Sequence, residues 1–364
     1  MEIESITTAG FRNLNNLTAE FAPGINIFYG DNGSGKTSLL EALFTLCLTR
    51  SQRGAADPVM LNVSSEYYRL EGKVHLGAQS ADIAVAFQKG MRKKITIDGV
   101  AVRPVELYER LSVVSSGPED SEILSGAPSA RRLFLDIYLS QMSPSYLSDL
   151  SDYQKVLVQK NAALRREMDP SPFEPLLIDY GVKVMQARHR FLEQLGPLVC
   201  NGYETVSRGE KLEMKYHPKV AWPEDCAADD TVSLRSAFEQ ALTAARTRER
   251  ARQIATVGPH RDEIDITIGG LPARTHGSQG QWRTAAVCLK LAVFESLRTR
   301  RKTAPILLLD EIFAELDQSR AAALMATLEN AGQIFLTTAI EPPESLARGA
   351  RKFRIKAGCI EEVH

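Results

Sequence analysis

Cysteine is scarce in this sequence, and its few cysteines stand in no arrangement that would bind a metal ion. Only five of the 364 residues are Cys, and none of them forms a C-x-x-C pair. A structural zinc site or a thiol redox motif would need closely spaced pairs of that kind. Scattered thiols instead fit a reducing compartment. We therefore expect a cytoplasmic protein.

Long apolar runs and a surplus of one charge are missing as well. Apolar runs such as residues 306–309 are far shorter than the roughly 20 residues that span a bilayer. Residues 1–4 open a strand and not a signal peptide, so no membrane association is expected. With 44 basic and 45 acidic residues the net charge is -1. Any binding of nucleic acid must therefore depend on local basic patches.

The sequence does contain a phosphate-binding loop. Residues 30–37, Gly-Asp-Asn-Gly-Ser-Gly-Lys-Thr, fit the pattern G-x-x-x-x-G-K-[ST]. A strand is predicted over residues 24–29 and a helix over 38–48. The loop between them would therefore bind phosphate at a helix N-terminus. We expect ATP here, with Lys36 at its β- and γ-phosphates and Thr37 at Mg²⁺. The expected nucleotide-binding residues of the loop are Gly30, Asp31, Asn32, Gly33, Ser34, Gly35, Lys36, Thr37 and Ser38.

Two acidic residues follow a short apolar strand near the C-terminus. The continuous apolar run at residues 306–309 predicts a strand that is buried on both faces, as in a parallel sheet. Asp310 and Glu311 come directly after it, which is the Walker B pattern. We expect Asp310 to hold Mg²⁺ and Glu311 to orient and polarise the water that attacks the γ-phosphate.

A second candidate anion site lies at the start of the helix predicted over residues 279–300. Ser278, Gly280 and Gln281 fit S-x-G-Q, and Ser and Gly at a helix N-terminus can bind phosphate. Taken alone, such residues more often cap the helix. In a chain with one phosphate loop, however, the site can bind the γ-phosphate held by another copy. Ser278 is therefore also a catalytic candidate.

The order of these motifs resembles the ATP-binding-cassette ATPases, which act as head-to-tail dimers. The sequence Ala-Glu-Leu-Asp at residues 314–317 completes that order. Many cassette ATPases have a switch histidine at the end of the last core strand. This chain has Thr337 and Thr338 there, and Thr338 is the expected stand-in.

The chain divides by its patterns into three segments. Residues 1–125 read as an N-terminal ATPase lobe, in which an antiparallel sheet surrounds the phosphate loop. Residues 126–256 read as a helical lobe, where apolar stripes at 147–164 and 173–191 predict a short antiparallel hairpin. Residues 257–364 return to strand and helix alternation and carry the remaining ATPase motifs. The fold expected is an α/β P-loop ATPase head with an inserted helical domain. The hairpin fits bundle packing or a projecting binding arm equally well.

Several longer segments make a closer resemblance, to the RecF family of bacterial recombination-repair ATPases. They are residues 10–13, 31–42, 128–136, 258–262, 278–281 and 310–317, in that order over nearly the whole chain. RecF is similar to the heads of SMC proteins but lacks their long coiled coils. The resemblance implies ATP-dependent homodimers and weak, DNA-stimulated ATP hydrolysis. It also implies DNA binding at gaps and junctions, action with RecR and RecO in loading RecA, and a part in the SOS response.

The same resemblance assigns Arg12 to the nucleotide phosphates, a role that suits its fixed charge and planar fork. The chain departs from the family pattern at residues 115–120, so roles for Glu119 and Asp120 stay open. His260 fits either a buried structural position or a nucleotide sensor. The candidate DNA contacts are the basic clusters at 92–94, 131–132, 246–252, 298–302 and 348–354.

Two other classes share the phosphate loop. A cassette ATPase coupled to a membrane or another non-DNA partner would carry a switch histidine and a glutamine loop, and neither is recognisable in the sequence. A small-molecule kinase would leave Ser278–Gln281 and residues 314–317 without a role. ATP-dependent DNA binding would separate the repair ATPase from both.

Overall fold

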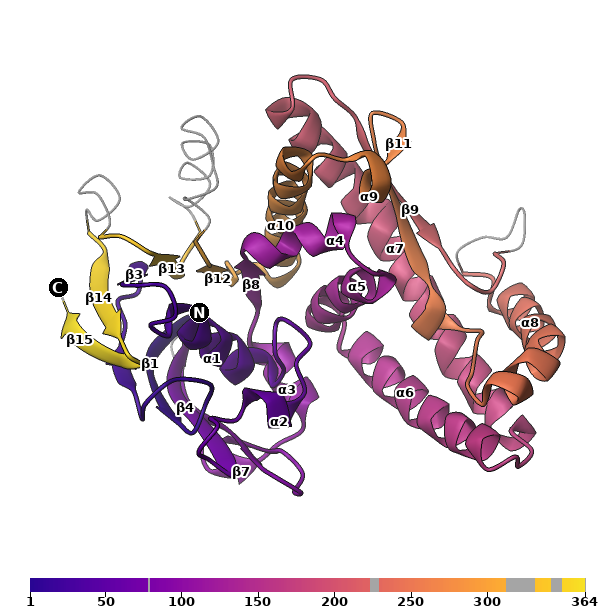
Figure 1. Cartoon of the computed structure of the whole chain (residues 1–364), viewed down its shortest axis with the longest axis horizontal. Helices are drawn as coiled ribbons and strands as arrows, with labels where there is room; N and C mark the ends of the chain where they lie inside the picture. The colour runs from indigo at the N-terminus through magenta and orange to yellow at the C-terminus, as the bar shows by residue number, and fades with distance from the viewer. Residues whose placement is uncertain (78, 223–228, 312–330, 342–348, 364) are drawn as a thin grey trace. The chain divides into compact units, whose positions relative to one another are not determined.

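The computed structural model describes residues 1–77, 79–222, 229–311, 331–341 and 349–363, which belong to two compact units. Unit 1 comprises Met1–Asp120 and Val293–His364, and unit 2 comprises Ser121–Ala292. Helix α10 (Gln279–Arg301) continues from unit 2 into unit 1 (Figure 1). Residues 257–292 therefore pack with the helical unit, although the sequence groups them with the last ATPase segment. The assignment of ATPase roles to three segments stays a prediction.

Unit 1 contains the parallel core sheet that the sequence predicts. Its strand order is β15-β14-β3-β13-β12-β8, and all strands except β15 run parallel. The apolar strands are buried on both faces, which is typical of parallel sheets. The carboxyl ends of β3, β13 and β12 therefore share one edge. The strands are β3 (Ile25–Tyr29), β8 (Val113–Ser116), β12 (Ile306–Leu309), β13 (Ile334–Thr338), β14 (Arg351–Lys356) and β15 (Cys359–Val363).

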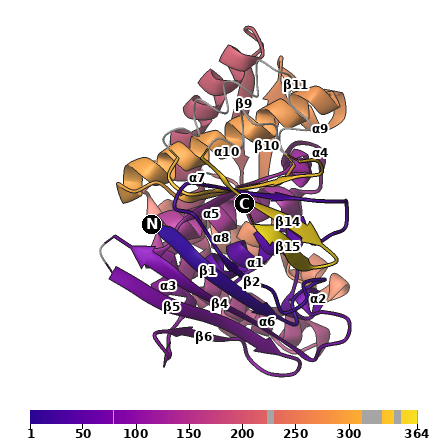
Figure 2. The same cartoon turned by 90° about the vertical axis from the view of Figure 1, so that its left-hand side faces the viewer.

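A second, antiparallel sheet completes unit 1 and confirms the predicted β lobe. Its order is β2-β1-β4-β5-β6-β7, and Figure 2 shows β1, β4, β5 and β6 lying next to one another. Asp98 and Gly99 take positive φ angles of 51° and 78° and turn the chain between β6 and β7, as predicted. The strands are β1 (Glu2–Ala9), β2 (Thr18–Glu20), β4 (Tyr67–Leu76), β5 (Gln79–Gln88), β6 (Lys94–Ile97) and β7 (Val100–Ala101).

Helix α1 (Lys36–Leu48) lies between the two sheets of unit 1. It packs on β4 and β5 from one sheet and on β8, β12 and β13 from the other. Almost all its side chains are buried, because a helix covered on two sides needs apolar residues all round. This burial fixes the helix that follows the phosphate loop. The shorter helical elements of unit 1 are α2 (Asp57–Met60), α3 (Pro104–Arg110) and η1 (Pro118–Ser121).

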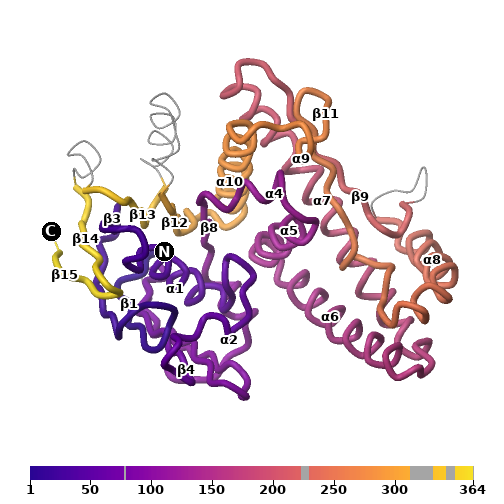
Figure 3. Tube along the Cα trace, viewed as in Figure 1, coloured from indigo at the N-terminus to yellow at the C-terminus, as the bar shows by residue number. Residues whose placement is uncertain are grey.

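Unit 2 contains the predicted antiparallel hairpin as α6 (Pro144–Arg165) and α7 (Glu174–Val206), which Figure 3 traces side by side. Helix α7 extends beyond the predicted stripe at residues 173–191 and continues past Pro197. Helix α8 (Thr231–Arg252) packs on α7. Gly181 permits this contact, because a Cβ there would lie 2.5 Å from Phe238. The other helical elements are α4 (Glu122–Ser125), α5 (Pro128–Met142), η2 (Ser171–Phe173), η3 (Pro259–Arg261) and α9 (Ala273–His276).

One strand of unit 2 was not predicted. Strand β9 (Leu212–His217) pairs antiparallel with β10 (Glu263–Ile268), which also pairs with β11 (Leu271–Pro272). The strand covers part of α7. The prediction of a helical lobe over residues 126–256 is therefore wrong at this point. Among the described helices, none is both long and apolar enough to cross a membrane.

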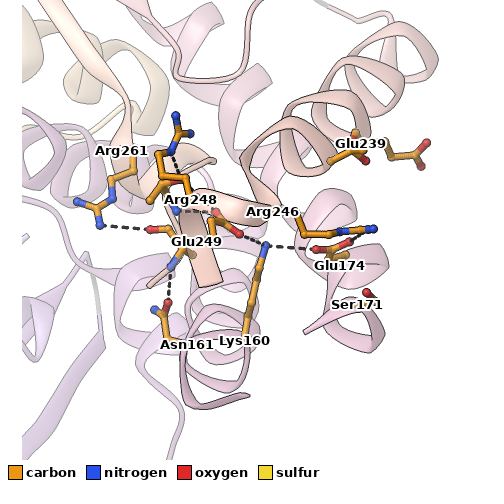
Figure 4. A network of polar contacts seen from close by, with 12 residues as sticks. Lys160, Asn161, Ser171, Glu174, Glu239, Arg246, Arg248, Glu249 and Arg261 are labelled. Carbon is orange, nitrogen blue, oxygen red and sulfur yellow. Dashed lines mark hydrogen bonds and ion pairs between the residues drawn. The ribbon is translucent and has the colours of Figure 1, made fainter. Parts of the chain in front are cut away.

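A buried lysine joins the three long helices of unit 2 (Figure 4). Lys160 of α6 is fully buried, and its Nζ lies 2.8 Å from Glu249 of α8 and 3.5 Å from Glu174 of α7. Asn161 accepts a hydrogen bond of 2.7 Å from the Ala255 amide, just beyond α8. A buried charge is tolerated when it is paired in this way. The network therefore fixes the C-terminal ends of α6 and α8 next to each other.

Candidate functional site

The phosphate loop joins β3 to α1 and depends on glycine for two reasons. Gly30, Gly33 and Gly35 have φ angles of 144°, 78° and 114°, which L side chains rarely adopt. At Gly30, a Cβ would also lie 2.2 Å from the carbonyl oxygen of Ile355 on β14. The glycines therefore allow β14 to pack closely against the loop and also leave the loop backbone open to phosphate.

Two residues outside the motif hold the loop in place. Asn13 donates to the Gly33 carbonyl at 3.0 Å and accepts from the Ser38 hydroxyl at 2.7 Å. The amide of Gly358, in the turn between β14 and β15, donates to the Ser34 carbonyl at 2.8 Å. The Ser38 hydroxyl, predicted to bind nucleotide, thus holds Asn13. No signal in the sequence singled out Gly358, because its role depends on strand order.

The loop presents groups suited to an anion. The N-terminal amides of α1 follow Gly35, where the helix dipole favours negative charge. The buried Ser34 hydroxyl has no hydrogen-bond partner in the described structure. Asp31 and Asn32 are exposed at the rim. These observations fit the predicted triphosphate site.

Lys36 is buried against its own loop. Its Nζ donates to the carbonyls of Gly30 and Asp31 at 2.7 and 3.0 Å, and it lies 3.5 Å from a carboxylate oxygen of Glu311. The structure thus brings together the predicted phosphate-binding lysine and the predicted catalytic glutamate. Glu311 has a φ angle of 47°, which is uncommon for a residue other than glycine.

Thr37 and Asp310 meet across the edge of the parallel sheet. The Thr37 hydroxyl lies 3.0 and 2.9 Å from the two carboxylate oxygens of Asp310. Oxygen ligands of this kind are what Mg²⁺ prefers, so the two residues fit the predicted metal site, and metal binding by them stays a prediction. A second hydroxyl, from Thr337, lies 2.6 Å from the same carboxylate. The role of Thr338 as a stand-in for the switch histidine stays a prediction.

Arg12 binds a carboxylate of α1. Its Nε and Nη2 atoms donate to Glu41 at 2.8 and 2.9 Å, and Nη1 donates to the Val59 carbonyl at 3.0 Å. Glu41 is buried, and Ser51 donates to it as well. Three of the five guanidinium N–H groups are thereby used. The contact between Arg12 and nucleotide phosphate stays a prediction.

The S-x-G-Q segment forms a helix cap in unit 2. The Ser278 hydroxyl accepts from the Gln281 amide at 3.2 Å, and the Gln281 side chain accepts from the Ser278 amide at 2.8 Å. This reciprocal arrangement is a capping box. Gln281 also donates to Glu210 at 2.7 Å. Its action on another copy's nucleotide, together with that of Gly280, stays a prediction. Residues 314–317 lie outside the described residues.

His260 is held as a structural histidine. Its Nε2 lies 3.2 Å from the Ala255 carbonyl, which can only accept, so Nε2 carries the proton. Nδ1 therefore accepts from the Tyr153 hydroxyl at 2.6 Å. Burial lowers the pKa of His260 to about 4, and the ring is neutral at physiological pH. Of the two roles that the sequence left open, the contacts favour the structural one.

Glu119 and Asp120 are tied within unit 1. Glu119 forms an ion pair of 2.7 Å with Arg53, and Asp120 accepts from the Gly117 amide at 2.9 Å. A Cβ at Gly117 would lie 3.1 Å from Asp310. The segment 117–120 thus borders the predicted metal site.

Most predicted basic clusters prove to be partly internal. Arg131 is buried and forms an ion pair with Glu263. Lys93 forms an ion pair with Asp57 and donates a hydrogen bond to the Thr49 carbonyl. Arg92, Lys94, Arg250 and Arg252 are exposed, and the charge of Arg250 helps to lower the pKa of Asp169. In the remaining clusters Arg246, Arg298, Lys352 and Arg354 form ion pairs, Arg248 and Arg301 donate hydrogen bonds, and Arg348 lies outside the described residues.

Comparison with known proteins gives consistent matches over the full chain. The family profile described as RecF/RecN/SMC N terminal domain matches residues 2–355. The chain is 35% identical to the DNA replication and repair protein RecF of Halalkalibacterium halodurans, over 93% of this chain and 92% of that protein. It is 36% identical to the RecF protein of Heliobacterium modesticaldum, over 98% of each.

Solved structures agree with these matches. The recombination mediator protein RecF of the RecFOR pathway, solved with ATP, matches 99% of this chain and 96% of its own, with a TM-score of 0.89 and 30% identity. The same mediator with ATPrS gives a TM-score of 0.87 and 31% identity. An Smc head domain from Pyrococcus furiosus matches with a TM-score of 0.53 at 14% identity, a likeness of fold alone.

Proposed function

This chain belongs to the RecF family of DNA replication and repair proteins, and from that membership we propose that it dimerises on ATP and binds gapped or branched DNA. It is a recombination-repair ATPase. The observation that carries the proposal is the meeting of Lys36, Thr37, Asp310 and Glu311 at the carboxyl edge of one parallel sheet.

ATP binding is supported by the loop and by the solved relatives that hold ATP or ATPrS. Lys36 would exchange the carbonyls of Gly30 and Asp31 for β- and γ-phosphate oxygens. The carbonyls are neutral and the phosphate oxygens are negatively charged, so Coulomb attraction to the ammonium favours the exchange. The Ser34 hydroxyl and the α1 amides would bind the remaining phosphate oxygens.

The oxygens of Thr37 and Asp310 would hold Mg²⁺, directly or through water. When bound, the ion neutralises the charge that develops on the transferred phosphoryl group. The hydrogen bond between the two side chains already places their oxygens together at the end of the phosphate loop.

Glu311 would act as the general base. Its carboxylate takes a proton from a water that attacks the γ-phosphorus in line, the bond to the bridging oxygen breaks, and ADP and phosphate leave. Lys36 lies 3.5 Å from this carboxylate. One ammonium cannot pair fully with Glu311 and also reach the phosphates. Nucleotide binding would therefore free the base.

We base dimerisation on the presence of two phosphate-binding motifs in each chain, the loop in unit 1 and Ser278–Gln281 in unit 2. Ser278, Gly280 and Gln281 would contact the γ-phosphate held by a second copy. The capping box supports this role, because it fixes the hydroxyl and amide at a helix N-terminus. The dimer would be the state that binds DNA.

We place the DNA contact at the C-terminal ends of α6 and α8. These ends carry Arg165, Arg166, Arg250 and Arg252, which are all exposed, and Arg250 interacts electrostatically with Asp169. The Lys160–Glu249 and Asn161–Ala255 contacts hold the ends together. The helix C-termini favour cations, which is the simpler explanation for any one arginine. Four together suit a phosphate backbone.

The pathway named for the solved relatives suggests RecR and RecO as partners. We propose that the chain acts with them in the cytoplasm to promote RecA loading on gapped DNA, and so contributes to the SOS response. Weak ATP hydrolysis that is stimulated by DNA is part of the same proposal.

Two variants test the proposal. Lys36→Ala should abolish ATP binding in calorimetry, whereas Lys94→Ala, at the exposed start of β6, should bind ATP normally. Glu311→Gln should bind ATP, lose turnover, and accumulate as a dimer that retards a gapped duplex in a gel shift. Normal ATP affinity in Lys36→Ala, or a monomer that binds no DNA in Glu311→Gln with ATP and Mg²⁺, would contradict it.

A further inference from the structure

The hydroxyl of Thr337 makes two hydrogen bonds to the predicted catalytic strand end. Thr337 lies on β13, between β3, which leads to the phosphate loop, and β12, which leads to Asp310 and Glu311. Its Oγ1 donates to Asp310 Oδ1 at 2.6 Å and accepts from the Glu311 amide at 2.9 Å. The side chain is buried, with 2% exposure. A single hydroxyl thus contacts both consecutive acidic residues.

The first bond orients the carboxylate of Asp310. A threonine hydroxyl has one proton, and the carboxylate cannot donate, so the Thr337 proton points at Asp310 Oδ1. Thr37 approaches the same carboxylate from the phosphate loop, at 3.0 and 2.9 Å. Asp310 is therefore held between two threonines from different strand ends, and its rotation is restricted.

The second bond fixes the backbone at Glu311. A non-glycine residue at a φ angle of 47° lies in the left-handed region, which costs about 1 kcal/mol or more and persists only when its surroundings hold it. The Glu311 amide donates to the Thr337 hydroxyl in that conformation. The direction of the Glu311 side chain follows from this backbone.

We propose that Thr337 is a positioning residue for ATP hydrolysis, which sets the Asp310 carboxylate and the Glu311 backbone through one hydroxyl. The inference rests on the proposed ATPase reaction. Thr337 acts through these two neighbours. Groups that orient metal-binding carboxylates typically change metal affinity or activity by 10–100-fold when removed. Because threonine does not titrate, the position adds no pH dependence, unlike a histidine.

Three variants test this role. Thr337→Val keeps the shape and removes the hydroxyl, and Thr337→Ser keeps the hydroxyl. The control Thr7→Val removes a threonine hydroxyl on β1, which contacts the Thr18 hydroxyl in the antiparallel sheet. We expect kcat to fall about 10–100-fold in Thr337→Val and less than about threefold in the other two. ATP affinity without Mg²⁺, measured by calorimetry, should be unchanged in all three.

A second readout does not depend on turnover. The Mg²⁺ concentration that gives half-maximal strengthening of ATP binding should rise about tenfold in Thr337→Val and return in Thr337→Ser. Equal kcat and equal Mg²⁺ dependence in Thr337→Val and wild type would overturn the role of Thr337 while leaving the ATPase intact. If the wild type hydrolyses no ATP, the proposed function itself fails and this inference falls with it.

Discussion

The guanidinium of Arg12 donates two hydrogen bonds to the carboxylate of Glu41, of 2.8 Å from Nε and 2.9 Å from Nη2. Arg12 follows β1 and has a φ angle of 50°, and Glu41 is buried on α1. The fork geometry is one that arginine provides and lysine does not. The pair therefore ties the segment after β1 to the helix that begins at the phosphate loop, with two N–H groups of Arg12 left over.

Separate substitutions of this pair should distinguish structure from nucleotide contact. Glu41→Gln should lower the free energy of unfolding by about 1–3 kcal/mol, because a buried acceptor of a charged bond is weakened. Its ATP affinity should change less than about threefold. Arg12→Ala should lose similar stability and, in addition, weaken ATP binding about tenfold or more through the lost phosphate contact. Urea unfolding and calorimetry measure the two quantities.

If Arg12→Ala and Glu41→Gln have the same ATP affinity, the guanidinium serves α1 alone. Arg12→Lys provides the control for charge, since it keeps the cation and loses the fork. We expect it to restore part of the ATP affinity but little of the stability.

The site was predictable where a motif fixes a local backbone, and not where it depends on strand order. The loop from Gly30 to Thr37 and the strand end at Asp310 follow from patterns of a few residues. The contact of Gly358 with Ser34 joins opposite ends of the chain, and the contact of Thr337 with Asp310 joins residues 27 positions apart on neighbouring strands. They arise because β14, β3, β13 and β12 are neighbours, which no local pattern states.

The fold shows the same distinction. The hairpin of α6 and α7 was predictable because each helix buries a periodic apolar stripe. Strand β9 alternates apolar and polar residues, so its signal is present, but it is short and follows a 33-residue helix. Its partner strand β10 begins at Glu263, and the paired residues are about 50 positions apart in the sequence. The sheet is therefore visible only in the tertiary structure.

The cap at Ser278 gives a prediction about dimerisation. Ser278→Ala removes the capping hydroxyl and should cost about 1 kcal/mol of stability. Ser278→Arg should cost about as much, keep ATP binding, and block the ATP-dependent dimer, because a long cation would occupy the space of the second copy's γ-phosphate. Size-exclusion chromatography with ATP and Glu311→Gln as background measures the dimer. A dimer peak unchanged by the arginine would remove Ser278 from the interface.

The ends of α6 and α8 give a prediction about DNA. Arg250→Ala with Arg252→Ala should weaken binding of a gapped duplex and reduce the slope of log affinity against log salt by about 2, at roughly 0.9 per lost phosphate contact. Arg92→Ala with Lys94→Ala removes two exposed cations, one before β6 and one at its start, and should leave the slope unchanged. A reversed result would place the DNA on unit 1, and no change in either pair would exclude both surfaces.

The ring of His260 makes the stability of unit 2 depend on pH. Burial lowers its pKa to about 4, against about 6.5 in an unfolded chain. Between these values the unfolded state binds a proton that the folded state does not, so stability is full above pH 6.5 and is lost as pH falls towards 4. The expected loss between pH 7 and pH 5 is about 2 kcal/mol from this group.

Other carboxylates titrate near that range, so the measurement compares two proteins. His260→Gln can still donate to the Ala255 carbonyl and accept from Tyr153, but it does not titrate. Urea unfolding at pH 7 and pH 5 should show a loss that is smaller by about 2 kcal/mol in His260→Gln than in the wild type. Equal losses would mean that His260 takes up its proton without disturbing the Tyr153 and Ala255 contacts, and the ring would then be free to act as a sensor after all.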